Sequence, residues 1–198
     1  MIDGSQKQID TQTNNTYALV LIGGGSTRMG KDKYLLEVHG KPQYQFLYEL
    51  LTEMGLKTFI SCNAGQVAKI PPGFPLIVDQ FDQIGPIGGI ASAFLRDMDV
   101  NWLVVACDLV HIDKQAISRL LEAISHEYDV VTYKKKHAAY FETVLTCYLS
   151  NVSGSMFEQM ERDEYSLQTL LKNVNVKTIS TEDESLFKNV NTPGDLLS

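Results

Sequence analysis

The chain has 198 residues, which is enough for one globular domain and short for two. Hydrophobic residues make up 44% and charged residues 21%, so the composition excludes a disordered or fibrous protein. The net charge of −7 at pH 7 has the wrong sign for a protein that neutralises nucleic-acid phosphates, so we expect no nucleic-acid partner. A smaller phosphate ligand would have to meet a local cationic pocket.

Residues 1–16 are polar and lack periodicity, so we expect a flexible leader at 1–16 and a single domain at 17–198. No apolar run reaches the ~18 residues of a membrane span, and the leader has no apolar signal-peptide core. We therefore expect a cytoplasmic protein with no membrane partner. The cysteines are widely spaced without a CxxC pair, so we interpret them as reduced, mostly buried thiols: Cys62, Cys107 and Cys147.

From Tyr17 onward, short apolar runs alternate with helical patterns, which is typical of βα units that feed a mainly parallel sheet. The runs predict strands at 17–22, 58–62, 76–78, 102–106, 129–133, 140–149 and 176–180. Helices are predicted at 43–54, at 88–98, from Asp113 to about 126, and once or twice within 153–173. The fold class is therefore α/β, a single domain with helices flanking the sheet, and ligands should bind at the carboxyl ends of the strands.

The segment 23–33 (GGGSTRMGKDK) directly follows the first predicted strand. Consecutive glycines let backbone N–H groups approach an anion, while Arg28, Lys31 and Lys33 supply positive charge. The segment therefore predicts a seat for a triphosphate, with a glycine-rich turn carrying solvated cations as the alternative. It is not a P-loop, because Asp32 stands where a Ser or Thr would bind Mg²⁺, and Arg28 replaces the last glycine of a dinucleotide fingerprint.

Two acidic residues follow predicted strands. Asp108 comes just after the strand at 102–106, where a carboxylate faces the ligand crevice, so we predict it to bind Mg²⁺ together with substrate phosphates. A capping or turn role is the alternative, although Asp113 is already available to cap the next helix. Asp79 follows the strand at 76–78, where an Asx-turn and a ligand contact are both open.

The glycine-rich segment 85–90 (GPIGGI) opens a predicted helix, and its N–H groups favour an anion or a nucleobase edge. We assign its glycines to substrate binding, with close helix packing as the alternative: Gly85, Gly88 and Gly89. The loop 189–193 (NVNTP) has the form of a helix start. The histidines and cysteines show no metal spacing or nucleophile partner, so we give them no catalytic role.

Taken together, these segments resemble the nucleotidyltransferase family that includes molybdenum cofactor guanylyltransferase. The resemblance runs from Leu19 through most of the chain. The matching pieces are 21–24 (LIGG), 26–30 (STRMG), 32–33 (DK), 35–36 (LL), 40–42 (GKP), Asp79, 85–90 (GPIGGI), 107–108 (CD), Glu142, Tyr148 and 189–193 (NVNTP).

The resemblance implies a Rossmann-like domain that joins GMP from GTP to the phosphate of molybdopterin bearing molybdenum, with release of pyrophosphate. It also implies a role for each matching residue. Guanine and ribose would meet Leu21, Gly23 and Gly24; the triphosphate would meet Arg28 and Lys33; further nucleotide contacts would be Asn63 and Asp79; Mg²⁺ would bind Asp108; and the molybdopterin side would hold Asn189 and Asn191. The groups expected to carry the reaction are Arg28, Lys33 and Asp108, since a phosphate oxygen is already anionic and needs no general base.

Gly23 and Gly24 resemble the guanylyl branch of the family, whereas the cytidylyl branch tends to have Ala-Gly there. The chain departs from the family pattern at Ile22, Val110 and Thr143, which bears on the base pocket and the organic acceptor. One alternative is therefore a cytidylyl- or uridylyltransferase acting on molybdopterin or on a sugar or polyol phosphate. Another is a catalytically silent nucleotide-binding domain that docks on a molybdoenzyme or its chaperone.

Overall fold

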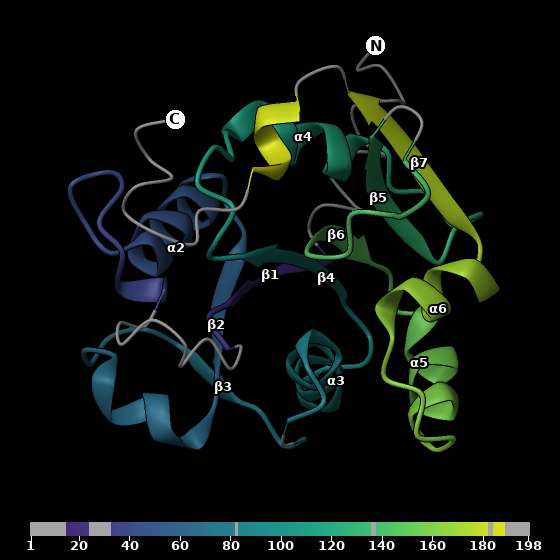
Figure 1. Ribbon diagram of the computed structural model, residues 1–198, viewed down its shortest axis with the longest axis horizontal. Coiled ribbons are helices and arrows are strands. Elements are labelled where there is room, and N and C mark those ends of the chain that lie inside the picture. The colour runs from purple at the N-terminus through teal and green to yellow at the C-terminus, as the bar shows by residue number, and fades with distance from the viewer. Residues whose placement is uncertain (1–14, 24–32, 82, 136–137, 182–183, 189–198) are drawn as a thin grey trace, which may run out of the picture.

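The computed structural model describes residues 15–23, 33–81, 83–135, 138–181 and 184–188. A seven-stranded sheet in the order β3-β2-β1-β4-β6-β5-β7 forms the centre (Figure 1). The strands are β1 (Thr16–Leu21), β2 (Lys57–Cys62), β3 (Leu76–Val78), β4 (Asn101–Ala106), β5 (Val130–Lys135), β6 (Leu145–Tyr148) and β7 (Val176–Thr181). The α-helices are α2 (Gln43–Glu53), α3 (Pro86–Arg96), α4 (Lys114–Glu122), α5 (Val152–Met160) and α6 (Leu167–Asn173). Short 3-10 helices lie at Lys33–Leu35, Ala64–Lys69 and Glu184–Phe187.

The sheet is mainly parallel, as the sequence predicts. β1 pairs in parallel with β2 and β4, β2 with β3, and β5 with β7, whereas β6 is antiparallel to β4 and β5. The carboxyl ends of β1, β2, β3 and β4 therefore meet at one edge of the sheet. This edge is where open α/β sheets bind ligands.

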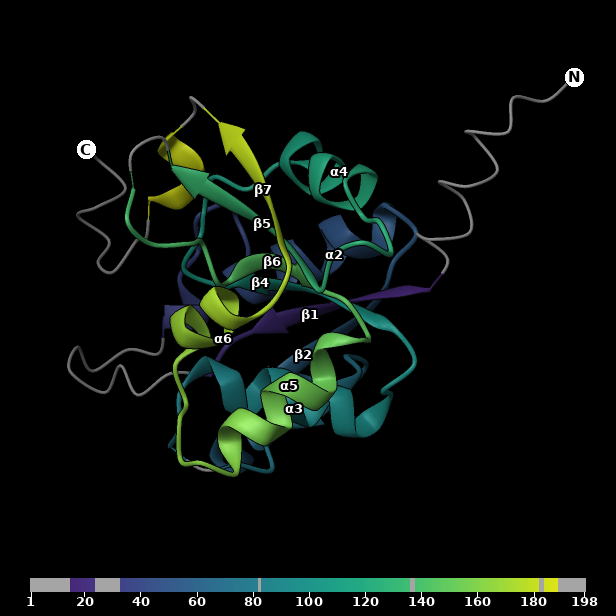
Figure 2. The same ribbon diagram turned by 90° about the vertical axis from the view of Figure 1, so that its right-hand side faces the viewer.

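Helices cover both faces of the sheet, with α2 and α4 on one side and α3 and α5 on the other (Figures 1 and 2). The strand β1 shows why: alternate side chains point into two separate apolar clusters, Val20 into the cluster with α2 and α4 and Leu19 into the cluster with α3, α5 and α6. A strand buried on both faces needs a continuous apolar run. The sequence 16–21 (TYALVL) supplies one.

Several predicted boundaries shift. The helix after Asp113 ends at Glu122 rather than near 126, and the helix predicted from Gly88 already begins at Pro86. β1 begins at Thr16, one residue before the predicted start of this strand. Residues 1–14 lie outside the described part of the chain.

The long strand predicted at 140–149 is wrong, because only Leu145–Tyr148 pair as β6. Glu142 explains the break. Its N–H donates to the Tyr133 carbonyl, 2.9 Å away, its carboxylate accepts from the Val144 N–H at 3.1 Å, and its carbonyl accepts from the hydroxyls of Thr132 and Thr146. These bonds satisfy the backbone around Glu142 outside the strand ladder, so residues 140–144 turn before β6 starts.

Within the described residues, no helix has the length and apolar character needed to cross a membrane.

Candidate functional site

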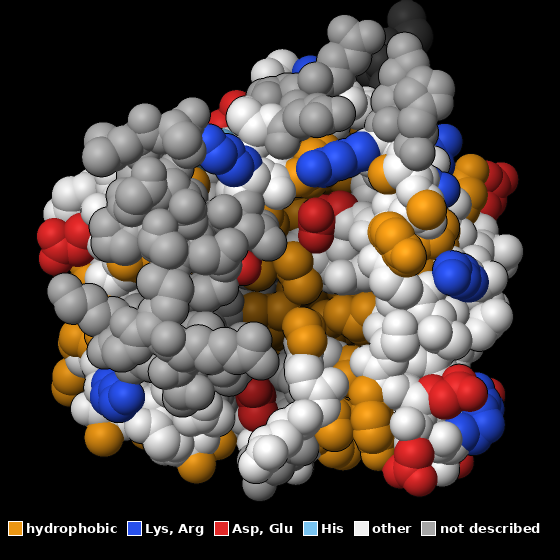
Figure 3. Space-filling view, in the orientation of Figure 1, with side chains coloured by type: hydrophobic (Ala, Val, Ile, Leu, Met, Phe, Trp, Pro, Cys, Tyr) orange, Lys and Arg blue, Asp and Glu red, His pale blue; other side chains and the backbone are white. Residues whose placement is uncertain are grey.

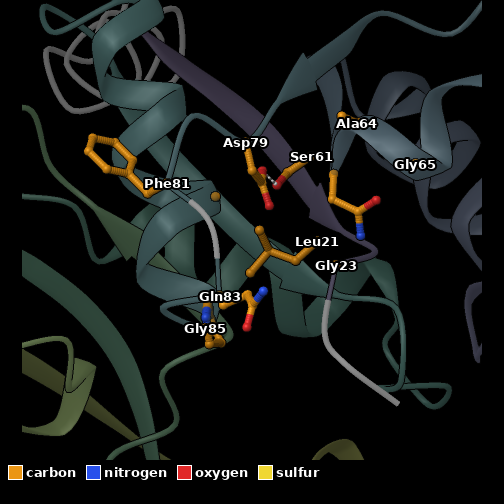
Figure 4. A pocket seen from close by; sticks show the side chains of 12 residues that line it. Leu21, Gly23, Ser61, Ala64, Gly65, Asp79, Phe81, Gln83 and Gly85 are labelled. Carbon is orange, nitrogen blue, oxygen red and sulfur yellow. Dashed lines mark hydrogen bonds between the residues drawn. The ribbon is translucent and has the colours of Figure 1, made fainter. Parts of the chain in front are cut away.

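A cavity of about 610 Å³ opens at the carboxyl ends of β1, β2 and β3, beside the N-terminus of α3 (Figure 4). Its walls come from three stretches of the chain, 21–23, 61–65 and 79–89, that are distant in sequence but meet at this edge of the sheet. The lining residues are Leu21, Gly23, Ser61, Asn63, Ala64, Gly65, Asp79, Phe81, Gln83, Gly85, Pro86 and Gly89.

The polar centre of this pocket is the carboxylate of Asp79, which follows the last residue of β3. The N–H of Asp79 donates to the Cys62 carbonyl at 2.9 Å, and its Oδ1 accepts from the Ser61 hydroxyl at 2.7 Å (Figure 4). Ser61 is buried on β2, the strand next to β3. The carboxylate is therefore held at a defined position on the pocket wall.

The buried thiol of Cys62 behind this wall is kept protonated. Burial raises the pKa of Cys62 to about 11, and the nearby Asp79 charge adds to the rise. A thiol needs its deprotonated form to act as a nucleophile. A protonated thiol is consistent with the sequence-based prediction that Cys62 has no catalytic role.

Glycines allow the close approach of α3 to the sheet. A Cβ at Gly89 would overlap the Ser61 hydroxyl and come within 3.1 Å of Leu21, and a Cβ at Gly88 would lie 2.9 Å from the Phe81 carbonyl oxygen. Gly85 has φ +80°, which disfavours other residues. Packing thus explains Gly88 and Gly89, and the backbone conformation explains Gly85. Gly85 and Gly89 also line the pocket.

A second polar group lies beyond β4. Asp108 is half-buried, and its Oδ1 is a buried atom. Burial raises the pKa of the Glu142 carboxyl; the bond from the Val144 N–H opposes this, and the charge of Asp108 adds to it. The positive charge of Lys135 acts in the opposite direction and lowers the pKa of the same carboxyl. In Figure 3, acidic side chains lie at the rim of a hollow lined by apolar ones.

This carboxylate pair has the right chemistry for a hard cation. Mg²⁺ usually takes one or two protein carboxylates and completes its coordination with water and substrate phosphates. Within the described ranges, no three His, Cys, Asp or Glu side chains gather closely enough to hold a metal by themselves. Asp108 with Glu142 nearby therefore suits a metal that arrives with a phosphate ligand.

The structure brings four of the predicted nucleotide contacts to one pocket: Leu21, Gly23, Asn63 and Asp79. Gly85 and Gly89, which the sequence assigns to substrate binding, line the same pocket. Gly88 and Asp108 are not among the lining residues. Lys33 opens a 3-10 helix, but its side chain, together with the whole of Gly24, Arg28, Asn189 and Asn191, lies outside the described residues.

Sequence reasoning missed other parts of the wall. Ser61 is a small hydroxyl residue that interrupts the apolar end of β2 (KTFISC), and this polar residue is the signal that the sequence offers. Gln83 has φ +60°, a left-handed conformation that the sequence does not reveal. Phe81 lines the pocket from the loop after β3, and Ala64 and Gly65 line it from the start of the 3-10 helix Ala64–Lys69.

A comparison with known families decides the relationship. Residues 18–178 match the model of the MobA-like NTP transferase domain, which is most of the chain. The chain belongs to this family. The resemblance inferred from the glycine-rich and acidic motifs is thereby confirmed.

Relatives within the MobA-like family support the same grouping. The chain is 32% identical over 190 residues to a molybdenum cofactor guanylyltransferase of Vibrio parahaemolyticus, covering 93% of this chain and 95% of that protein. It is also 32% identical over 149 residues to a molybdenum cofactor biosynthesis bifunctional protein of Synechocystis. That match covers 75% of this chain but only 43% of the longer protein.

The fold agrees as well. The crystal structure of molybdopterin-guanine dinucleotide biosynthesis protein A from Archaeoglobus fulgidus superposes with a TM-score of 0.74 at 22% identity, covering 91% of this chain and 95% of that one. The predicted α/β nucleotidyltransferase fold is confirmed.

Proposed function

We propose that this MobA-like chain transfers GMP from GTP to the phosphate of molybdopterin bearing molybdenum, and releases pyrophosphate. One observation carries the proposal. Leu21, Gly23, Asn63 and Asp79, which the family resemblance assigns to the nucleotide, line a single pocket in a chain that matches a guanylyltransferase over 93% of its length. The pocket of about 610 Å³ is within the usual range for a small-molecule site.

Leu21, Gly23 and Gly24 contact guanine and ribose, and Asn63 and Asp79 add polar contacts from the ends of β2 and β3. Arg28 and Lys33 hold the triphosphate. The close packing of Gly89 on Ser61 supports a rigid wall at this end of the pocket.

The acceptor side is assigned to Asn189 and Asn191, with Gly85, Gly88 and Gly89 at the start of α3. The substrates are then GTP and molybdopterin, and a molybdoenzyme or its chaperone is the partner that receives the product. The enzyme works in the cytoplasm.

Asp108 holds Mg²⁺ in this proposal. The half-buried Glu142 lies near enough for the charge of Asp108 to raise its pKa, so both carboxyls would act on the same cation. When bound, Mg²⁺ neutralises phosphate charge and helps to orient the reacting groups. Asp108 and Glu142 contribute by concentrating negative charge at one point of the sheet edge. Lys33 and Arg28 supply the opposite charge for the phosphates.

The chemical step needs no nucleophilic side chain. An acceptor phosphate oxygen, already negative at neutral pH, forms a bond to the α-phosphorus of GTP while the bond from that phosphorus to the bridging oxygen breaks, and pyrophosphate leaves with its electron pair. The protein must bring two anions together, so its residues act by positioning and charge neutralisation. The protonated thiol of Cys62 is consistent with a reaction that uses no nucleophilic side chain.

The decisive experiment incubates the protein with Mg²⁺, molybdopterin and α-labelled GTP, and follows label into the dinucleotide product. Parallel reactions with α-labelled CTP and UTP test the base, and reactions without molybdopterin or with EDTA test the acceptor and the metal. Label transfer from GTP alone is the expected result. Transfer from CTP would overturn the guanylyl assignment, and GTP binding without product would favour a silent adaptor domain.

A further inference from the structure

The side chain of Gln66 joins the ends of β1 and β2 behind the pocket. Gln66 lies on the 3-10 helix Ala64–Lys69 and is 7% exposed. Its Nε2 donates to the Ile22 carbonyl at 3.3 Å, and its Oε1 accepts from the Asn63 N–H at 3.0 Å. One amide group therefore ties together two backbone segments that are far apart in the sequence.

Both anchored segments line the nucleotide pocket. Ile22 lies between Leu21 and Gly23, and Asn63 begins the wall that continues into Ala64 and Gly65. Gln66 is not itself among the lining residues. Any influence of its amide on the ligand must therefore pass through the position of these two walls.

Helix capping explains only half of this arrangement. In a capping box, the residue three positions after the cap accepts a hydrogen bond from the cap residue, and Glu serves there as well as Gln. The bond from the Asn63 N–H is of this kind. The bond from Nε2 to Ile22 needs an N–H donor, which an ionised Glu lacks. The Gln66 amide thus makes a second hydrogen bond, to the Ile22 carbonyl, that capping does not require.

We infer that Gln66 is a positioning residue for the nucleotide, because its amide adds a second link between the turn after β1 and the Asn63–Gly65 wall, beside the backbone bond from the Ile22 N–H to the Ser61 carbonyl at 3.2 Å. The inference rests on the proposed nucleotide pocket. It adds to that pocket a supporting residue that lies outside all of the sequence motifs. The chemical groups assigned to the reaction are elsewhere, so loss of the bridge weakens nucleotide binding and raises KM, with kcat little changed.

Three variants test the role. Gln66→Glu keeps the capping acceptor and loses the donor to Ile22, whereas Gln66→Met loses both. Gln159→Met is the matched control, because Gln159 is also buried and donates its amide to the Glu164 and Ser166 carbonyls at 3.0 and 3.1 Å, away from the pocket. The dissociation constant of Mg²⁺–GTP is measured by calorimetry without acceptor, alongside thermal unfolding.

We expect Gln66→Glu and Gln66→Met to bind GTP about tenfold more weakly than the parent, the upper end for loss of one net hydrogen bond. Gln159→Met should lose stability while keeping the parent affinity. Lowering the pH protonates the introduced carboxyl of Gln66→Glu, which restores an O–H donor toward Ile22. Its affinity, taken relative to the parent at each pH, should therefore recover, while the ratio for Gln66→Met stays constant.

A Gln66→Glu protein with parent affinity at every pH overturns the inference. So does an equal loss in Gln159→Met, or a Gln66→Glu loss that does not recover on acidification, because either would reflect general destabilisation. If the parent binds CTP in place of GTP, the guanylyl assignment fails, and the same ratios measured with CTP still decide the role of Gln66.

Discussion

The hydroxyl of Ser61 on β2 donates a hydrogen bond of 2.7 Å to Oδ1 of Asp79 at the end of β3. The two residues are 18 positions apart in sequence, and the parallel pairing of Ser61 with Ile77 brings them together. Oδ2 of the same carboxylate faces Gly23, where an added Cβ would lie 3.3 Å away. One hydroxyl thus orients a carboxylate toward the turn that is proposed to hold the nucleotide.

Replacing Ser61 by Ala should loosen this carboxylate. We expect Ser61→Ala to weaken GTP binding by about 2- to 10-fold and to lower the free energy of unfolding by ~1 kcal/mol, the usual net value of one hydrogen bond. Calorimetry and urea denaturation measure the two effects. Ser153→Ala is the control, since Ser153 on α5 donates a 2.8 Å bond to the Ser150 carbonyl, which precedes the helix. An unchanged GTP affinity in Ser61→Ala would contradict the role of the pair.

Gly89 should tolerate no side chain while Ser61 is present. A Cβ there would overlap the Ser61 hydroxyl, so we expect Gly89→Ala to lower the free energy of unfolding by about 1–3 kcal/mol, as overpacking does. Combining it with Ser61→Ala removes the overlapping oxygen and should recover part of the loss. Gly154→Ala on α5 is the control, because a Cβ there meets nothing within 4 Å and alanine favours the helix. Additive losses in the double variant would count against this packing account.

The strands and their ends were largely predictable because a parallel strand buried on both faces leaves a continuous apolar run. The run at 17–22 is of this kind and predicts Leu21 at the ligand edge. β3, at the end of the sheet, is only partly buried, but its short apolar run LIV still predicts Asp79 at the same edge. The direction of β6 was not predictable, since a short run such as LTCY carries no signal that distinguishes a parallel from an antiparallel strand. The turn at Glu142 depends on hydroxyls from β5 and β6, which only the folded sheet brings near it.

The candidate site likewise has a part that the sequence predicts and a part that it does not. Glycines and acids carry local signals of tight turns and ligand contacts, so the motifs were visible. The residues that support them were not, because their partners are set by sheet register rather than by neighbours in sequence. Gln66 reaches Ile22 across 44 positions, and nothing in the segment AGQVAK indicates that partner.

Asp108 should be required for the metal-dependent step. We expect Asp108→Asn to lower turnover by at least about 100-fold and to weaken Mn²⁺ binding in the presence of GTP, followed by electron paramagnetic resonance. Asp113→Ala provides the contrast, because Asp113 caps α4 through a 2.7 Å bond from the Ala116 N–H. Its loss should remove ~1 kcal/mol of stability and leave turnover intact. Near-parent turnover in Asp108→Asn would remove the metal assignment.

Glu142 should make the metal-free protein less stable as the pH rises. Burial holds the pKa of its carboxyl above the ordinary value, so the folded state binds this proton more tightly than the unfolded state. At a pH below both values the carboxyl is neutral in both states and contributes nothing. As the pH rises from the ordinary value through the raised one, the folded state must ionise a buried group, and stability falls.

Glu142→Gln removes this ionisation while its amide oxygen still accepts from the Val144 N–H. The variant should therefore match the parent at low pH and gain stability over it across that window, with a constant advantage at higher pH. Urea denaturation at a series of pH values, in EDTA, measures the difference. The control Glu158→Gln removes the same charge at an exposed position of α5. A stability gain that is independent of pH would mean that the charge of Glu142 is not what strains this turn, and that the amide simply packs better there.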